Sequence, residues 1–125
     1  MERRVLVVED DLLNRMFYCE MLEQAGFAVD PVADGALVLG EVNRFAPELV
    51  IMDINLPNVS GLELIERLKA DPAHRNLPIL AITAYVGREE ERRIREAGAA
   101  EYLAKPVTMK TFVSAIERLL PRGTA

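Results

Sequence analysis

Five short runs of aliphatic and β-branched residues alternate with five longer segments of helical period, and this alternation constrains the fold more than any other feature. The predicted strands are residues 4–9, 28–33, 49–53, 78–83 and 101–104. Strands that alternate with helices build β-α units around a parallel sheet. The first, third and fourth runs are continuously apolar, as strands covered on both faces are, whereas the second contains Asp30 and Pro31 and the fifth is short and more polar. We therefore expect the first, third and fourth strands at the centre of the sheet.

The helices are predicted over residues 12–25, 35–46, 61–70 and 88–98, with a fifth after Thr108. Residues typical of helix caps stand at these boundaries, namely Gly26, Asp34, Ser60 and Thr108. Two helices are expected to bury particular side chains: Met16, Phe17, Met21 and Leu22 in the first, and Phe112, Val113, Ile116, Leu119 and Leu120 in the last. The fourth helix is charged nearly all round, so we expect it to be weakly held through Ile94 and Ala97.

Length and composition indicate a single domain over residues 1–125, because a chain of 125 residues that is half hydrophobic is able to bury one core. No apolar run approaches the roughly 20 residues that cross a bilayer, and the N-terminal stretch meets acidic residues too early for a signal peptide. The single cysteine, Cys19, cannot form an internal disulfide and is expected to be a core thiol. These features predict a cytoplasmic protein without a membrane partner. The net charge of -5 argues against a nucleic-acid partner, which needs clustered Lys and Arg.

Polar side chains follow the strands at the points where they end. Glu9 and Asp10 follow the first strand, Asp53 ends the third, Thr83 ends the fourth and Lys105 follows the fifth. Ligand sites of open α/β sheets lie beyond the carboxyl ends of the strands. If the first and third strands are neighbours, three carboxylates converge and repel one another, and such a cluster attracts a cation. Hard oxygen ligands with room for water favour Mg²⁺.

Asp53 is also a candidate nucleophile. An oriented carboxylate forms an aspartyl phosphate when the charge of the incoming phosphoryl group is neutralised. Lys105 would pair with one phosphoryl oxygen, and the Thr83 hydroxyl would donate to another. Asn55, two residues beyond Asp53, would present its backbone carbonyl to the metal.

Four motifs, VLVVEDD, VIMDINLPNVSG, AITA and YLAKP, occur in this order over nearly the entire chain. In them the chain resembles the receiver domains of bacterial two-component response regulators. The resemblance implies a flavodoxin-like α/β fold, a doubly wound sheet of five parallel strands in the order 2-1-3-4-5. It assigns Mg²⁺ binding to Glu9 and Asp10, phosphorylation by a histidine kinase or histidine phosphotransfer protein to Asp53, and phosphoryl binding to Thr83 and Lys105. It also implies that Tyr102 is the aromatic switch residue and that the Lys105-Pro106 peptide bond is cis.

Within this family the chain is similar to DivK-type single-domain regulators of cell division and polarity, through EDDLLNRMF and the stretch from Gly87 to Val107. Chemotaxis regulators, which also consist of a receiver alone, are the alternative. The resemblance implies output by protein contacts, with a target bound by residues 88–97, the fifth strand and the last helix. The protein would then catalyse only its own phosphorylation and dephosphorylation and would not be an enzyme for any other substrate.

Two further function classes share parts of this pattern. A phosphatase of the haloacid dehalogenase type also places an Asp nucleophile after a strand, but it needs a second acid where this chain has Asn55. A degenerate receiver, which binds partners without phosphorylation, usually lacks an acid or the lysine, and both are present here. His74 lies in a polar stretch with no second histidine or cysteine nearby, so we expect it to be exposed to solvent without a metal or phosphotransfer role.

Overall fold

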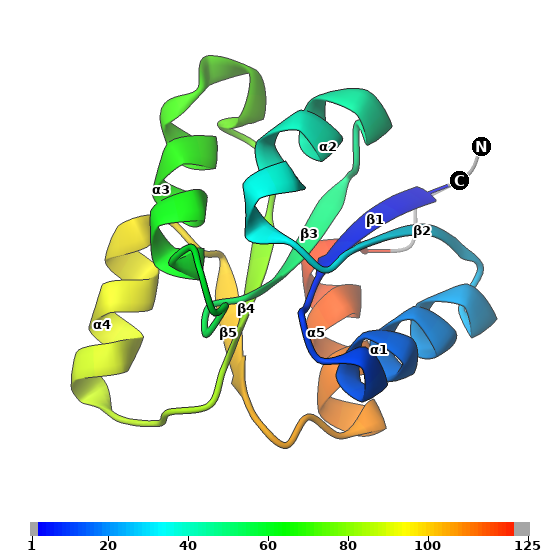
Figure 1. Cartoon of the computed structure of the whole chain (residues 1–125). Helices are drawn as coiled ribbons and strands as arrows, with labels where there is room; N and C mark the ends of the chain where they lie inside the picture. The colour runs from blue at the N-terminus through cyan, green and yellow to red at the C-terminus, as the bar shows by residue number, and fades with distance from the viewer. Residues whose placement is uncertain (1–2, 122–125) are drawn as a thin grey trace.

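In a computed structural model of the chain, which describes residues 3–121, a parallel sheet lies between two layers of helices (Figure 1). The strands are β1 (Arg3–Val8), β2 (Phe27–Val32), β3 (Leu49–Asp53), β4 (Ile79–Thr83) and β5 (Glu101–Ala104). The α-helices are α1 (Leu12–Gln24), α2 (Val38–Phe45), α3 (Gly61–Ala70), α4 (Arg88–Ala97) and α5 (Met109–Leu119). Two 3₁₀ turns, η1 (Gly35–Leu37) and η2 (Pro72–His74), precede α2 and β4.

The strand order is β2-β1-β3-β4-β5, and all neighbouring strands are parallel. This order confirms the flavodoxin-like fold, with β1, β3 and β4 at the centre and β2 and β5 at the edges. Every residue of β3 and β4 is buried, which agrees with their continuously apolar sequence. Pro31, which cannot donate a ladder hydrogen bond, lies on the edge strand β2, where that loss is tolerated.

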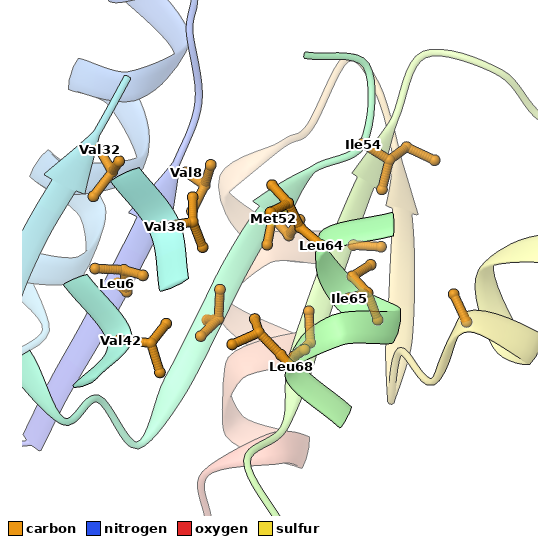
Figure 2. Close-up of a cluster of buried hydrophobic side chains, with 14 of the residues drawn as sticks. Leu6, Val8, Val32, Val38, Val42, Met52, Ile54, Leu64, Ile65 and Leu68 are labelled. Carbon is orange, nitrogen blue, oxygen red and sulfur yellow. The ribbon is translucent and has the colours of Figure 1, made fainter. Parts of the chain in front are cut away.

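The two faces of the sheet bury separate cores, because successive side chains of a strand point to opposite faces. Leu6 and Val8 of β1 belong to the core that α2, α3 and α4 cover, which Figure 2 shows in close-up. Val5 and Val7 belong to the core under α1 and α5. In Figure 1 the two helical layers lie on opposite sides of the sheet.

Side-chain caps fix where most helices begin. Asp11, Ser60 and Thr108 each accept a hydrogen bond from a backbone N–H in the first turn of α1, α3 and α5. The second helix differs from its predicted bounds: Asp34 caps η1, α2 itself begins only at Val38, and Ala46 closes it in the left-handed conformation with φ of 52°. Helix α4 is held as predicted, since Ile94 and Ala97 are its buried residues.

The predicted core face of α1 is only half correct. Met21 and Leu22 are buried, but Met16 is 58% exposed and Phe17 39% exposed. Apolar residues surround much of this helix, and the face formed by Tyr18, Met21 and Leu22, at positions i, i+3 and i+4, is the one that meets the sheet. Packing against the sheet therefore leaves the other apolar face in solvent.

Three smaller predictions also need correction. Val113 of α5 is 37% exposed, because Phe112 and Ile116 occupy the buried stripe without it. Cys19 is half-buried at the margin of the core rather than inside it. His74 is not exposed: its side chain retains 15% of its accessible area, and its Nε2 lies 3.1 Å from Asn43 Oδ1, because η2 folds it against α2.

Within residues 3–121, no helix combines the length and the apolar character that a membrane span requires.

Candidate functional site

The strand register brings the polar strand ends to one edge of the sheet. Val8 pairs with Met52, so Glu9 and Asp53 follow at the same level on adjacent strands. Thr83, the last residue of β4, pairs with Ala104, the last residue of β5, so Lys105 lies one residue beyond this common end of the two strands. Strands β1 and β3, which are neighbours, and β5, which lies beyond β4, thus deliver two acids and a lysine to the carboxyl edge, as the sequence predicts.

Three carboxylates form the centre of this site. One oxygen each of Glu9, Asp10 and Asp53 lies within 4.8 Å of the others. Glu9 and Asp53 are buried, with 0% and 1% of their area exposed, while Asp10 faces solvent. Among the described residues, Glu9 Oε1 is a buried oxygen without a hydrogen-bond donor. Two buried carboxylates, an open side and an unsatisfied oxygen fit a hard divalent cation that keeps some of its water, such as Mg²⁺.

Helix α1 fixes the backbone that carries the first two acids. The Asp11 carboxylate caps the helix by accepting from Asn14 N, so it does not join the cluster, while Asp11 N donates to Glu9 Oε2 at 3.1 Å. The Arg15 guanidinium donates to the carbonyls of Glu9 and Asp10 at 3.0 and 3.2 Å. The sequence alone does not identify Arg15 as a residue of this site, because its role depends on contacts with backbone atoms, and no pattern of side chains reveals such contacts.

Asp53 is oriented through both of its carboxylate oxygens. Asn55 N donates to Oδ1 at 2.9 Å, and Lys105 Nζ donates to Oδ2 at 3.3 Å. Lys105 Nζ also lies 3.5 Å from Glu9 Oε1, an ion-pair contact too long for a strong hydrogen bond. Burial alone would lower the pKa of Lys105, but the charges of Asp53 and Glu9 outweigh it and raise that pKa above its usual value.

The loop after Asp53 is joined to the loop after β4. The backbone carbonyl of Asn55 is the atom that the sequence assigns to a metal, while its side-chain Oδ1 accepts from Ala84 N at 2.8 Å. The Lys105-Pro106 peptide bond that follows β5 is cis, as the resemblance implies.

The two predicted switch residues point toward α4 rather than toward Asp53. The buried Thr83 hydroxyl lies 3.2 Å from the carbonyl of Tyr85 and 3.4 Å from Glu90 Oε2. The Tyr102 hydroxyl donates to Glu91 Oε2 at 3.3 Å. Neither glutamate stands out in a segment rich in glutamates and arginines, so the sequence did not reveal these contacts.

The pKa of Glu9 rises from 4.5 to about 7, first because the carboxyl group is buried and then because Asp53 lies beside it. In the unfolded chain this group loses its proton near pH 4.5, so between pH 4.5 and 7 the folded protein binds the additional proton. The stability contributed by Glu9 is therefore fully present below pH 4.5 and is lost as the pH rises through 7.

Between pH 5 and pH 8, titration of Glu9 should lower the unfolding free energy of the metal-free protein by about 2 to 3 kcal/mol. The Glu9→Gln variant should lack this loss, since its side chain does not titrate. Mg²⁺ should restore more stability at pH 8 than at pH 5, because the charged carboxylate is the ligand. Urea unfolding of both proteins at the two pH values, with chelator or Mg²⁺, measures the difference. Parallel pH profiles of wild type and Glu9→Gln would contradict this prediction.

Comparison with known proteins agrees with this geometry. The family model described as the response regulator receiver domain matches residues 5–117. The polar-differentiation response regulator DivK of Brucella anthropi is 35% identical over 120 residues, covering 96% of this chain and 98% of that protein. The chemotaxis protein CheY4 of Vibrio cholerae has a solved structure with a TM-score of 0.90 and 27% identity, covering 96% of this chain and all of that one.

A CheY-like receiver domain protein of Methanospirillum hungatei also has a similar solved structure, with a TM-score of 0.87 and 28% identity, covering 95% of this chain and 94% of that one. The family model spans the strand-end acids, Thr83 and Lys105, so the match includes the whole candidate site. The chain therefore belongs to the response regulator receiver domain family.

Proposed function

We propose that this protein is a signalling switch controlled by phosphorylation of Asp53. The observation that carries the proposal is the position of the Asp53 carboxylate, which lies in one acidic group with Glu9 and Asp10 and 3.3 Å from Lys105 Nζ. A buried nucleophile between a cation site and an ammonium group suits phosphoryl transfer, which depends on positioning and charge neutralisation.

The donor would be the phosphohistidine of a histidine kinase or histidine phosphotransfer protein. An Asp53 oxygen forms a bond to phosphorus as the bond from phosphorus to the donor nitrogen breaks, and that electron pair leaves with the donor imidazole. Glu9, Asp10, Asp53 and the Asn55 carbonyl would hold Mg²⁺, which supplies positive charge to the phosphoryl oxygens. Lys105 would pair with one of these oxygens.

Asn55 disfavours a phosphatase of the haloacid dehalogenase type. That chemistry needs a general acid two residues after the nucleophile, and the amide of Asn55 cannot supply a proton. We therefore propose that the protein is not an enzyme beyond its own phosphorylation and dephosphorylation. The acids and the lysine that a degenerate receiver usually lacks are all in place here.

The relatives narrow the proposal further. The name of the Brucella proteins refers to polar differentiation, so we infer a role in cell polarity or division in preference to chemotaxis. We infer cytoplasmic action, and a single cysteine that cannot form an internal disulfide agrees with a reducing compartment. The downstream protein would bind the surface of α4, β5 and α5, where the thinly anchored α4 responds most readily to the state of Asp53.

The test is incubation of the purified protein with acetyl phosphate and Mg²⁺, followed by intact mass and peptide mapping. We expect the mass of one phosphoryl group to be added at Asp53 and chelator to prevent it. Addition at another residue, or equal addition in chelator, would overturn the proposed function.

Lys105→Ala should separate metal binding from switching. The Lys105 ammonium competes with a cation for Asp53 and Glu9. The variant without it should therefore bind Mg²⁺ with the wild-type affinity or up to about fivefold more tightly, a factor that corresponds to ~1 kcal/mol of binding free energy. Any phosphoryl group formed should fail to alter partner binding, because its oxygen lacks the ammonium. Calorimetric Mg²⁺ titration measures the affinity, with Lys110→Ala, an exposed lysine of α5, as the control. Loss of Mg²⁺ binding in Lys105→Ala alone would mean that the lysine is structural.

A further inference from the structure

The two side chains proposed to act in switching are both held by the first turn of α4. Thr83 Oγ1 lies 3.4 Å from Glu90 Oε2, and the Tyr102 hydroxyl lies 3.3 Å from Glu91 Oε2. Glu90 and Glu91 are consecutive residues of that turn. One short segment therefore contacts a residue at the end of β4 and a residue within β5.

Each of the two carboxylates is itself held in place by an arginine. Glu90 Oε1 lies 3.6 Å from Arg93, and Glu91 Oε1 lies 3.2 Å from Arg95. Both glutamates thus use one oxygen for an arginine of α4 and the other for a switch residue. The Arg95 guanidinium also lies 6.0 Å from the centre of the Tyr102 ring, within the range of a cation–π contact.

The neighbouring Glu89 has no such role, although it lies in the same turn and has the same chemistry. It pairs with Arg92 at 2.6 Å, and its side chain is 72% exposed. The side chains of Glu90 and Glu91 are 16% and 39% exposed, so their hydrogen bonds are better shielded from water. Position within the turn, rather than charge alone, distinguishes the two glutamates that contact the switch residues.

The contacts of Glu90 and Glu91 are significant because α4 buries few apolar side chains. Its buried side chains are Ile94 and Ala97, and the residue before it, Gly87, makes no side-chain cap hydrogen bond. A helix with so little apolar anchoring moves at low free-energy cost when a polar contact is lost.

We propose that Glu90 and Glu91 are positioning residues that hold Thr83 and Tyr102 in the unphosphorylated arrangement. The inference rests on the proposed function and deepens it. The Thr83 hydroxyl has one proton, for which the Tyr85 carbonyl at 3.2 Å and Glu90 Oε2 at 3.4 Å are the acceptors. Donating it to a phosphoryl oxygen on Asp53 therefore ends its donation to both. Loss of the Glu90 contact frees the first turn of α4 and weakens the adjoining contact of Glu91 with Tyr102. The proposed partner surface of α4, β5 and α5 then shifts toward its phosphorylated conformation.

Fluorine NMR of protein labelled with 3-fluorotyrosine tests this inference, since the chain has three tyrosines and each gives a separate resonance. In the unphosphorylated Glu91→Ala variant, the Tyr102 resonance should move in the direction that acetyl phosphate with Mg²⁺ produces in the wild type. Amide exchange over residues 88–97 should become about fivefold faster in Glu90→Ala and in Glu91→Ala, the factor expected for one typical hydrogen bond. Alanine is the strongest helix former, so intrinsic helix propensity does not account for faster exchange.

Three controls distinguish positioning from a general effect of charge. Glu89→Ala removes an ion pair from the same turn and should change neither measurement. Glu91→Gln keeps an acceptor for the Tyr102 hydroxyl and should return the resonance close to that of the wild type. In the Tyr102→Phe background, Glu91→Ala should add little to the exchange rate, because the contact is already absent.

The inference and the proposed function fail in different ways. An unmoved Tyr102 resonance in Glu91→Ala, or equal exchange in the Glu89, Glu90 and Glu91 variants, overturns the inference even if Asp53 is phosphorylated normally. A wild-type protein that takes up no phosphoryl group overturns the proposed function, while the comparison of the unphosphorylated variants still shows whether the two glutamates hold the switch residues.

Discussion

Replacing Asp53 with asparagine is expected to abolish phosphorylation by acetyl phosphate, lowering its rate on the order of a thousandfold or more. The amide oxygen is a far weaker nucleophile than the carboxylate and carries no charge with which to bind a cation. The side chain stays nearly the same size, so the buried site, 1% exposed in the native protein, should keep its packing. Intact mass spectrometry over a time course, with Mg²⁺ present, measures the loss.

Asp11→Asn is the matched control for this substitution. Asp11 lies beside the acidic group but caps α1 through Asn14 N, and asparagine is an equally good cap residue. The control should be phosphorylated at about the wild-type rate. Persistent phosphorylation of Asp53→Asn would show that the acceptor is another residue, and loss in both variants would show that the acidic edge, rather than Asp53, is the requirement.

Gly61→Ala is expected to destabilise the protein by at least about 3 kcal/mol. A Cβ atom at Gly61 would lie 2.3 Å from Ile54 Cα and 2.6 Å from the carbonyl oxygen of Asp53. Both are backbone atoms, one of them in a central strand, so neither is able to yield as a flexible side chain would. The first turn of α3 would have to move away from the peptide that carries the nucleophile.

Gly40→Ala is the same chemical change, but we expect it to raise the stability of the protein rather than lower it. Gly40 is exposed on α2, and a Cβ there meets no atom within 4 Å. Alanine in this helical position should stabilise the protein by ~1 kcal/mol. Urea unfolding of the two variants measures both effects, and a Gly61→Ala protein within about 0.5 kcal/mol of the wild type would contradict the close approach of α3 to Asp53.

The sequence predicted which strands lie at the centre of the sheet, and it predicted the principal residues of the site. Continuous apolar runs marked β1, β3 and β4 as central, because strands buried on both faces have no polar positions. Glu9, Asp53 and Lys105 were recognisable because parallel strands share one carboxyl edge, so residues at their ends meet whatever the details of packing.

The tertiary structure alone decided how the helices lie on that sheet. The apolar residues of α1 permit more than one face to be buried, and only contact with the sheet selected Tyr18, Met21 and Leu22 over Met16 and Phe17. His74 was likewise hidden by the fold of a turn against α2, which its polar sequence neighbours do not indicate.

The sequence by itself therefore determined the strands, which of them lie at the centre, and the acids and lysine at one edge, because each follows from local composition or from the geometry of parallel strands, whereas the full strand order was what the family resemblance implied. The structure decided the contacts that depend on how each helix is placed against its neighbours: Gly61 against Ile54, Arg15 against the carbonyl of Glu9, and the contacts of Glu90 and Glu91 with the hydroxyls of Thr83 and Tyr102. The physical reason is that a helix rotation of a few tens of degrees changes which side chains meet a neighbour, while leaving the periodic sequence pattern unchanged.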